Sequence, residues 1–249
     1  MGTAAVLAAL IAVAGCTAKH GAAHALRVCS TGDYRPFTYR DAAGQWSGLD
    51  IDLARDLAHR LGTGAVFVPT TWATLTDDVG SACDLAMGGI TVTPQRAQKA
   101  LFSDSYLHDG KAAMVRCVDV PRYRSLAEID QPGVRVIVNP GGTNEQFDRG
   151  HLHRATIMEY PDNNTIFEQL LAGAADVMIT DSSEIRWQET QHRQLCAARA
   201  GMFTDGQKAY LLPRSATALQ RRVNDWLGRI RRDGSFAQIS RRWLGSAAN

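Results

Sequence analysis

Short apolar runs alternate with helical stretches along most of the chain, beginning near residue 26. Strands are predicted at 26–30, 66–68, 84–87, 134–138, 156–159 and 176–180, where apolar runs are bounded by polar or turn residues. Residues 49–61 have apolar side chains at helical spacing, with Asp50 placed to cap the start of the helix and Gly62 to end it. Strands that alternate with helices predict an α/β protein.

The pattern also predicts two lobes. After residue 113 a new series of strands begins, with a helix expected at 165–172. An extended run at 208–212 then leads into amphipathic helices over 219–244. We therefore expect one lobe of residues 26–113 with 211–249 and another of residues 114–210. Ligands of open α/β sheets bind at the carboxyl ends of strands, so the cleft between the lobes is the expected site.

The first residues differ from the rest of the chain. Residues 4–14 are apolar throughout, a run too short for a membrane span of about 20 residues but suited to a secretory signal. The sequence Val13-Ala14-Gly15-Cys16 matches a lipoprotein signal box, which predicts a lipidated Cys16 and a membrane tether. A plain cleaved signal or a packed N-terminal helix is the alternative, and residues 1–15 lack the usual Lys or Arg. We expect an exported, periplasmic protein with a signal peptide at 1–15 and a linker at 16–25.

Composition and charge exclude several classes of protein. The 27 Lys and Arg residues nearly balance the 25 Asp and Glu residues, and the net charge of +2 argues against a nucleic-acid partner. The 45% of hydrophobic and 21% of charged residues are typical of a globular domain, not of a disordered or fibrous chain. Beyond Cys16, the chain has four cysteines, which spacing alone does not pair. With no Cys-x-x-Cys or His-Glu-x-x-His motif, we expect no metal site.

Residues able to bind anions follow two of the predicted strands. After 84–87, Thr93 can cap a helix whose first residue is Pro94, which places Arg96 at the edge of the cleft. Arg96 could bind a carboxylate there, or it could form an ordinary surface ion pair. After 134–138, a Pro-Gly-Gly turn leads to a helix start at Thr143, which favours an anion.

A candidate acid follows a third strand. Glu184 comes three residues after Asp181, and by this pattern alone a capping box, in which Glu184 bonds back to the Asp181 N–H, is favoured over a catalytic acid. Trp72 is expected either to form a wall of the cleft or to lie in the core. The seven His residues are scattered without a Ser or Cys partner, so nucleophilic catalysis has no support.

Across residues 26–244 the chain resembles the periplasmic solute-binding proteins that serve amino-acid ABC importers. Within that superfamily it is similar to the cyclohexadienyl dehydratases, which are exported prephenate and arogenate dehydratases. The stretches that carry the resemblance are Thr31-Gly32-Asp33-Tyr34, Pro69-Thr70-Thr71-Trp72, Tyr106-Leu107-His108-Asp109-Gly110-Lys111, Val138-Asn139-Pro140-Gly141-Gly142-Thr143-Asn144-Glu145, Pro161-Asp162-Asn163, Thr180-Asp181 with Glu184, and Lys208-Ala209-Tyr210-Leu211-Leu212-Pro213-Arg214.

The resemblance implies a type II periplasmic-binding-protein fold, with two hinge crossovers and the ligand cleft between the lobes. It implies an enzyme that needs no cofactor and converts a small dicarboxylate, prephenate, to phenylpyruvate, and arogenate to phenylalanine. Glu184 would be the general acid, which requires burial to keep it protonated against the helix dipole. The residues that would bind the substrate are Asp33, Tyr34, Trp72, Gly89, Thr91, Arg96, Thr143, Asn144, Asp181 and Lys208.

The resemblance also bears on the cysteines and on the alternative function. It implies a disulfide between Cys117 and Cys196, whereas Cys29 and Cys83 depart from the family pattern and are interpreted as buried thiols. The alternative function is that of a non-catalytic receptor for an amino-acid ABC importer. Cys16 favours that alternative, because tethered receptors are common in such systems.

Overall fold

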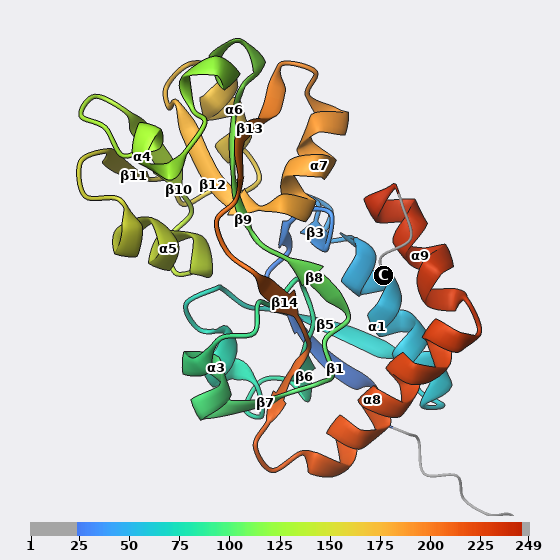
Figure 1. Ribbon diagram of the computed structural model, residues 1–249. Coiled ribbons are helices and arrows are strands. Elements are labelled where there is room, and N and C mark those ends of the chain that lie inside the picture. Colours follow the sequence, from blue (N-terminus) through green and yellow to red (C-terminus); the bar gives the residue numbers. More distant parts are fainter. Residues whose placement is uncertain (1–23, 246–249) are drawn as a thin grey trace, which may run out of the picture.

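The computed structural model describes residues 24–245 and has two α/β lobes, each built on its own sheet (Figure 1). The sheet of lobe 1 has the order β5-β1-β6-β15-β7, in which β1 is parallel to β5 and β6 while β15 is antiparallel to β6 and β7. Its strands are β1 (Leu26–Ser30), β5 (Ala65–Pro69), β6 (Leu85–Ala86), β7 (Ala100–Phe102) and β15 (Leu211–Pro213).

Helices cover both faces of this sheet. Residues of α1, α8 and α9 form the larger core with the sheet, and Leu75 of α2 belongs to a smaller cluster with Cys29, Cys83 and Leu211. A short three-stranded sheet lies beside the first helix. These elements are α1 (Leu49–Arg60), α2 (Leu75–Asp78), α3 (Pro94–Lys99), α8 (Thr217–Arg232), α9 (Ser235–Leu244), β2 (Asp33–Tyr34), β3 (Thr38–Arg40) and β4 (Trp46–Ser47).

Lobe 2 has a sheet of the order β11-β10-β12-β9-β13, with β10 parallel to β11 and β12 and with β9 antiparallel to β12 and β13. Two core clusters lie on its two faces, one containing Ile185 of α7 and the other Phe147 of α5. The elements of this lobe are β9 (Lys111–Arg116), η1 (Cys117–Arg122), α4 (Leu126–Ile129), β10 (Arg135–Val138), α5 (Thr143–His151), β11 (Thr156–Glu159), α6 (Ile166–Leu171), β12 (Val177–Asp181), α7 (Ser182–Gln191) and β13 (Leu195–Met202).

Two crossovers join the lobes side by side. The chain enters lobe 2 through β8 (Leu107–Asp109) and returns through β14 (Gly206–Lys208), and these strands pair antiparallel between the two sheets (Figure 1). The predicted two-lobed fold is therefore confirmed, while the lobe boundaries drawn from the sequence stay a prediction. The extended run expected at 208–212 is divided between β14 and β15, because Lys208 belongs to the crossover and Leu211 to the sheet.

The predicted capping role of Asp50 is wrong. Gly48 occupies the N-cap of α1 at φ 130°, where a Cβ atom would lie 2.3 Å from the Phe37 carbonyl oxygen. The Asp50 carboxylate is instead fully buried and accepts hydrogen bonds from the Gly89 N–H at 2.6 Å, the Tyr106 hydroxyl at 2.6 Å and the Tyr210 hydroxyl at 3.1 Å. Burial raises its pKa to about 6, although these three donors oppose the shift.

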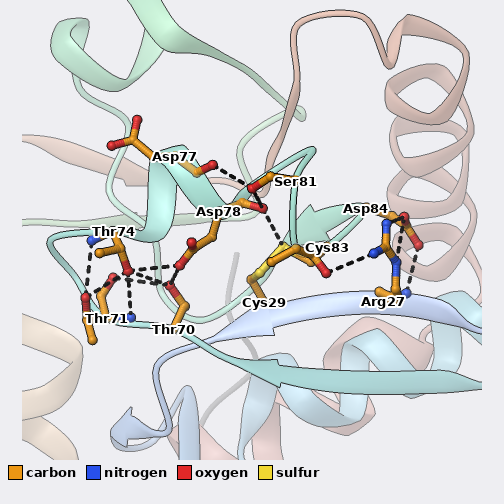
Figure 2. The surroundings of a disulfide bond; sticks show 11 residues. Arg27, Cys29, Thr70, Thr71, Thr74, Asp77, Asp78, Ser81, Cys83 and Asp84 are labelled. Atoms are coloured by element: carbon orange, nitrogen blue, oxygen red, sulfur yellow. Dashed lines mark hydrogen bonds and ion pairs between the residues drawn. A yellow bond between two sulfur atoms is a disulfide. The ribbon is translucent and has the colours of Figure 1, made fainter.

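All four cysteines of the described chain are paired. Cys117 and Cys196 form a disulfide, as the resemblance implies. Cys29 and Cys83 form a second one, so their interpretation as buried thiols is wrong (Figure 2). Cys29 lies in β1, and Cys83 lies just before β6, the strand that pairs with β1. The pairing of the two strands places the Cα atoms of the cysteines 5.6 Å apart, within the usual range for a disulfide.

The N-terminal predictions concern another part of the chain. The expected signal peptide at 1–15, the lipidated Cys16 and the linker up to residue 23 lie outside the described residues. Between residues 24 and 245, none of the helices is long and apolar enough to cross a membrane.

Candidate active site

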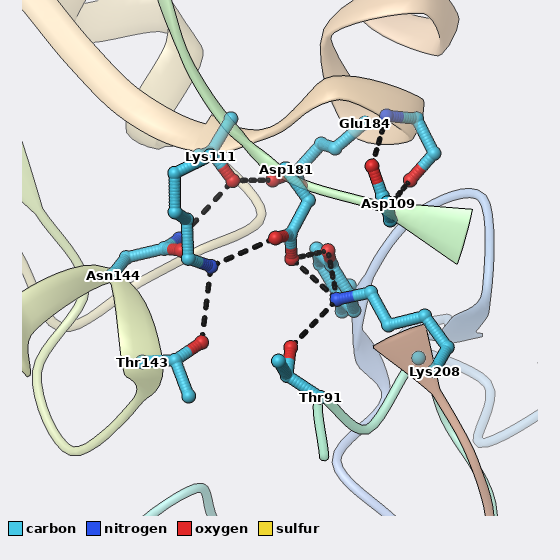
Figure 3. A network of polar contacts seen from close by, with 12 residues as sticks. Thr91, Asp109, Lys111, Thr143, Asn144, Asp181, Glu184 and Lys208 are labelled. Atoms are coloured by element: carbon cyan, nitrogen blue, oxygen red, sulfur yellow. Dashed lines mark hydrogen bonds and ion pairs between the residues drawn. The ribbon is translucent and has the colours of Figure 1, made fainter. Parts of the chain in front are cut away.

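A buried ion cluster lies where the crossovers meet the sheet of lobe 2 (Figure 3). Asp181 ends β12 and is only 5% exposed. The Lys111 ammonium lies 2.8 Å from its Oδ1 atom, and the Lys208 ammonium lies 2.6 Å from its Oδ2 atom. Lys111 reaches it because the antiparallel register of β9 and β12 sets Lys111 directly opposite Asp181. The Tyr34 hydroxyl of lobe 1 donates a further hydrogen bond to Oδ2.

The two lysines fix the charge of Asp181. Burial alone would raise the pKa of this carboxyl, but the charges of Lys111 and Lys208 outweigh it and hold the pKa well below its usual value. Asp181 is thus ionised and already paired on both oxygens. An ammonium group of a ligand would find no free carboxylate at this position.

The lysines also connect the cluster to the walls of the cleft. Lys111 donates to the Thr143 hydroxyl at 3.0 Å and to the Asn144 side-chain oxygen, at the N-terminus of α5. Lys208 donates to the Thr91 hydroxyl at 2.9 Å. The cluster thereby links residues of both lobes.

Arg96 supplies a further cation. Its helix begins as predicted, with Thr93 as the N-cap that accepts from the Arg96 N–H and with Pro94 as the first residue. The guanidinium donates to the Thr91 carbonyl at 2.9 Å and lies 6.0 Å from the centre of the Trp72 ring. Burial lowers its pKa to about 10, so it stays charged at neutral pH.

Gly89 lets the backbone approach the cavity closely. It has φ +66°, and a Cβ atom there would lie 2.5 Å from the Tyr34 ring. Its N–H is held by the buried carboxylate of Asp50. A side chain at this position would displace Tyr34 and with it the hydrogen bond to Asp181.

Glu184 is not part of a capping box. Its carboxyl accepts a hydrogen bond from the Thr180 hydroxyl, and that hydroxyl accepts one from the Asn144 amide at 3.1 Å. The start of α7 is satisfied by Asp109, whose carboxylate accepts from the Ser183 N–H at 3.2 Å and from the Ser182 hydroxyl at 2.7 Å. The local pattern fails because the crossover strand β8 delivers Asp109, a better-placed acceptor.

The environment of Glu184 keeps it neutral. The residue is 1% exposed. Burial and, to a lesser degree, the charge of Asp181 raise its pKa to about 8, against the hydrogen bond from Thr180 and the charge of Lys111. Glu184 is therefore mostly protonated at neutral pH.

These groups surround a small cavity between the lobes, with a volume of about 30 Å³. The residues lining it are Tyr34, Trp72, Gly89, Thr91, Arg96, Asn139, Gly142, Thr143, Asn144, Asn163 and Asp181. Trp72 thus lies in the cleft wall, the first of the two placements expected from the sequence.

Three residues predicted from the sequence do not line this cavity. Lys208 lies behind Asp181, and Glu184 lies behind Asn144. Asp33 lines an adjoining hollow that shares Trp72 and Asn139 with the cavity.

Other residues were missed. Lys111 contacts Asp181, and the cavity is also lined by Asn139 and Asn163. They occur within stretches that carry the family resemblance, which is the signal that could have identified them. Among residues 24–245, no group of three or more His, Cys, Asp or Glu side chains is arranged to hold a metal ion.

A two-lobed α/β fold with a charged cavity between the lobes defines a ligand-binding protein of the periplasmic class. The model of the bacterial extracellular solute-binding proteins, family 3, matches residues 26–246. The chain belongs to this family.

Sequence and structure comparisons give closer relatives. The chain is 46% identical to the cyclohexadienyl dehydratase of Pseudomonas aeruginosa over 221 residues, which cover 88% of this chain and 82% of that protein. It is 45% identical in sequence to an ancestral cyclohexadienyl dehydratase of known crystal structure. The two structures align with a TM-score of 0.54 over 89% of this chain and 92% of that chain. The ancestral amino acid-binding protein AncCDT-1, described as a precursor of cyclohexadienyl dehydratase, is 32% identical with a TM-score of 0.82 and coverage of 88% and 95%.

Proposed function

We propose that this chain is an exported cyclohexadienyl dehydratase that converts prephenate to phenylpyruvate and arogenate to phenylalanine. The proposal is supported by the 46% identity to the Pseudomonas aeruginosa enzyme over most of both chains. The geometric observation that carries it is a buried carboxyl, Glu184, that stays protonated close to a cavity lined by Arg96 and adjoined by the lysine pairs of Asp181.

The charges of the site suit a substrate with two carboxylates. Asp181 is the single acidic residue among those that line the cavity. Arg96 also lines the cavity, and Lys111 and Lys208 form ion pairs with Asp181. With Glu184 neutral, the cluster has an excess of positive charge, which attracts a dianion. We propose that Arg96 and the backbone at Gly142 and Thr143 bind the carboxylates and that Trp72 faces the ring.

The reaction needs one proton and no electron transfer. The bond between the ring and its carboxylate breaks and releases carbon dioxide, and its electron pair enters the ring. The ring carbon opposite loses its hydroxyl group, which takes the proton of Glu184 and leaves as water. The ring becomes aromatic, so a positioned acid is sufficient.

Direct transfer requires Glu184 to come within about 2.6–3.2 Å of the leaving oxygen. Asn144 and Asp181 lie at the cavity surface in front of it. The proposal therefore requires one of these side chains to move aside when the substrate binds. Asn144 is the better candidate, because Asp181 is fixed by two ion pairs.

A non-catalytic receptor for an amino acid is the second candidate. The relationship to AncCDT-1, an amino acid-binding protein, favours it. The double pairing of Asp181 weighs against it, because the amino group of a ligand would compete with two buried lysines. Under this alternative an ABC importer would be the partner.

A paired assay distinguishes the two functions. Purified protein is incubated with prephenate while phenylpyruvate absorbance is followed, and is separately titrated with amino acids by calorimetry. We expect turnover above the spontaneous rate and only weak heats with amino acids. Tight binding of an amino acid without turnover would favour the receptor.

We also propose that the protein is exported, with Cys16 as its lipidated N-terminus after cleavage of residues 1–15. Membership of an extracellular family supports export. In cells, the full chain should partition into the detergent phase and its Cys16→Ser variant into the aqueous phase. Equal partitioning of both would contradict the lipid anchor.

A further inference from the structure

Buried oxygen atoms without hydrogen-bond donors lie at the cavity and at the hollow that adjoins it. Asn163 is 6% exposed and lines the cavity, and its amide nitrogen donates to the Asp33 carbonyl oxygen at 2.8 Å. This bond leaves the amide oxygen of Asn163 free. Within residues 24–245, neither that oxygen nor Oδ1 of Asp33 nor the Thr31 hydroxyl has a hydrogen-bond partner, although all three atoms are buried.

These oxygens come from both lobes. Asp33 belongs to β2 of lobe 1, and Asn163 precedes α6 of lobe 2. Asp33 and Thr31 line the hollow that shares Trp72 and Asn139 with the main cavity. The positively charged guanidinium of Arg96 lies 6.0 Å from the Trp72 ring centre. The cleft can therefore bind a ligand carboxylate through its cations. On the other side of Trp72 it has hydrogen-bond acceptors for a donor group of the same ligand.

An unpaired buried acceptor is unfavourable, and a ligand that supplies donors removes this cost. Burial raises the pKa of Asp33, and the nearby Asp162 adds to the rise. The Thr31 hydroxyl and the Trp72 indole lie near this carboxyl and oppose the rise, but neither reaches the geometry of a hydrogen bond to the buried Oδ1. A cationic donor would favour the ionised carboxylate again. An ammonium group has three N–H donors and no acceptor, which matches a group of unpaired oxygens.

We propose that Asp33, with Asn163 and Thr31, forms an ammonium subsite that favours arogenate over prephenate. This inference rests on the proposed dehydratase function. The two substrates differ in one group of the side chain, which is an ammonium group in arogenate and a ketone in prephenate. The ketone is only an acceptor, so it would leave the oxygens of the subsite unpaired. The lysine pairs of Asp181 leave Asp33 as the carboxylate available to this ammonium.

The test compares kcat/KM for arogenate and prephenate in the wild type and in Asp33→Asn. Hydrogen bonds to charged groups contribute about 1.5–3 kcal/mol, so the value for arogenate should fall roughly 10- to 100-fold. The value for prephenate should change less than about threefold, within the effect of one neutral hydrogen bond. An equal fall for both substrates, or no change for either, would overturn the subsite.

Two further variants make the test specific. Asp162→Asn removes a nearby exposed charge while its Oδ1 can still accept from the Asn164 N–H, so the ratio of the two values should change far less than in Asp33→Asn. Asn163→Ala should lower the value for arogenate selectively, and it tests the subsite independently if Asp33→Asn fails to fold. A selective effect of Asp162→Asn equal to that of Asp33→Asn would assign the preference to general electrostatics.

Binding of the products separates this inference from the dehydratase function. If the wild type turned over neither substrate, the dehydratase proposal would fail, and L-phenylalanine and phenylpyruvate would then serve as calorimetric probes. They differ in the same ammonium and ketone groups. The subsite predicts that Asp33→Asn weakens L-phenylalanine selectively, and equal weakening of both would refute it.

Discussion

Replacing Glu184 with Gln tests the protonation of the buried acid without any substrate. Glutamine has nearly the same shape as a neutral glutamic acid and can still accept from the Thr180 hydroxyl. The side chain is 1% exposed, so the ionised form of Glu184 is strongly disfavoured in the folded protein. The glutamine variant lacks this ionisation.

The size of the effect follows from the pKa values. Glu184 has a pKa of about 8 in the folded protein and an ordinary value of 4.5 when exposed. The folded state holds the proton more tightly, so the stability that this group contributes is fully present below pH 4.5 and is lost as the pH rises towards 8. The loss is about 1.4 kcal/mol per pH unit, or about 2–3 kcal/mol between pH 5 and pH 7.

Urea unfolding of the wild type and of Glu184→Gln at both pH values measures this difference. We expect the stability of the variant relative to the wild type to rise by about 2–3 kcal/mol from pH 5 to pH 7. Glu189→Gln on the same helix is the control, because Glu189 is exposed and its acceptor role towards the Ala197 N–H is kept. A constant difference for Glu184→Gln would show that Glu184 ionises normally, and it could then not act as an acid at neutral pH.

Two other predictions concern binding and the second disulfide. Arg96→Met should raise KM for prephenate roughly 10- to 100-fold in steady-state assays, because a charge-assisted hydrogen bond of about 1.5–3 kcal/mol is lost; an unchanged KM would remove Arg96 from the site. Replacing Cys29 and Cys83 with Ala opens a loop with a sequence separation of 54 residues. The variant should be less stable in urea by roughly 4 kcal/mol on the chain-entropy estimate, and equal stability would contradict that role.

Periodicity was sufficient to predict the α/β class, three strands of each lobe's sheet and the longer helices, because apolar spacing is set by each strand or helix itself. The helix start at Thr93 and Pro94 was also predictable, since its cap is local. Asp50 shows the limit of such patterns. An acidic residue at a helix start normally caps it, but here Tyr106 and Tyr210 from distant segments draw the carboxylate into the core.

The features of the site and of the core that were missed depend on contacts between distant segments. Lys111 meets Asp181 through strand register, and Cys29 meets Cys83 because β1 lies beside β6. Neither pairing leaves a local signal. Glu184 has a capping-box pattern by sequence, and only the position of Asp109 at the start of α7 shows that the carboxyl is free for another role.

The turnover of prephenate by the wild type and by Glu184→Gln tests the central claim most directly. Phenylpyruvate formation is measured at neutral pH, with calorimetry of phenylpyruvate binding to show that the cavity is intact. The account predicts a loss of at least about 100-fold in kcat with product binding largely unchanged, because a positioned general acid typically contributes 10²–10⁴-fold. Equal rates for the two proteins would contradict the role of Glu184 as the acid.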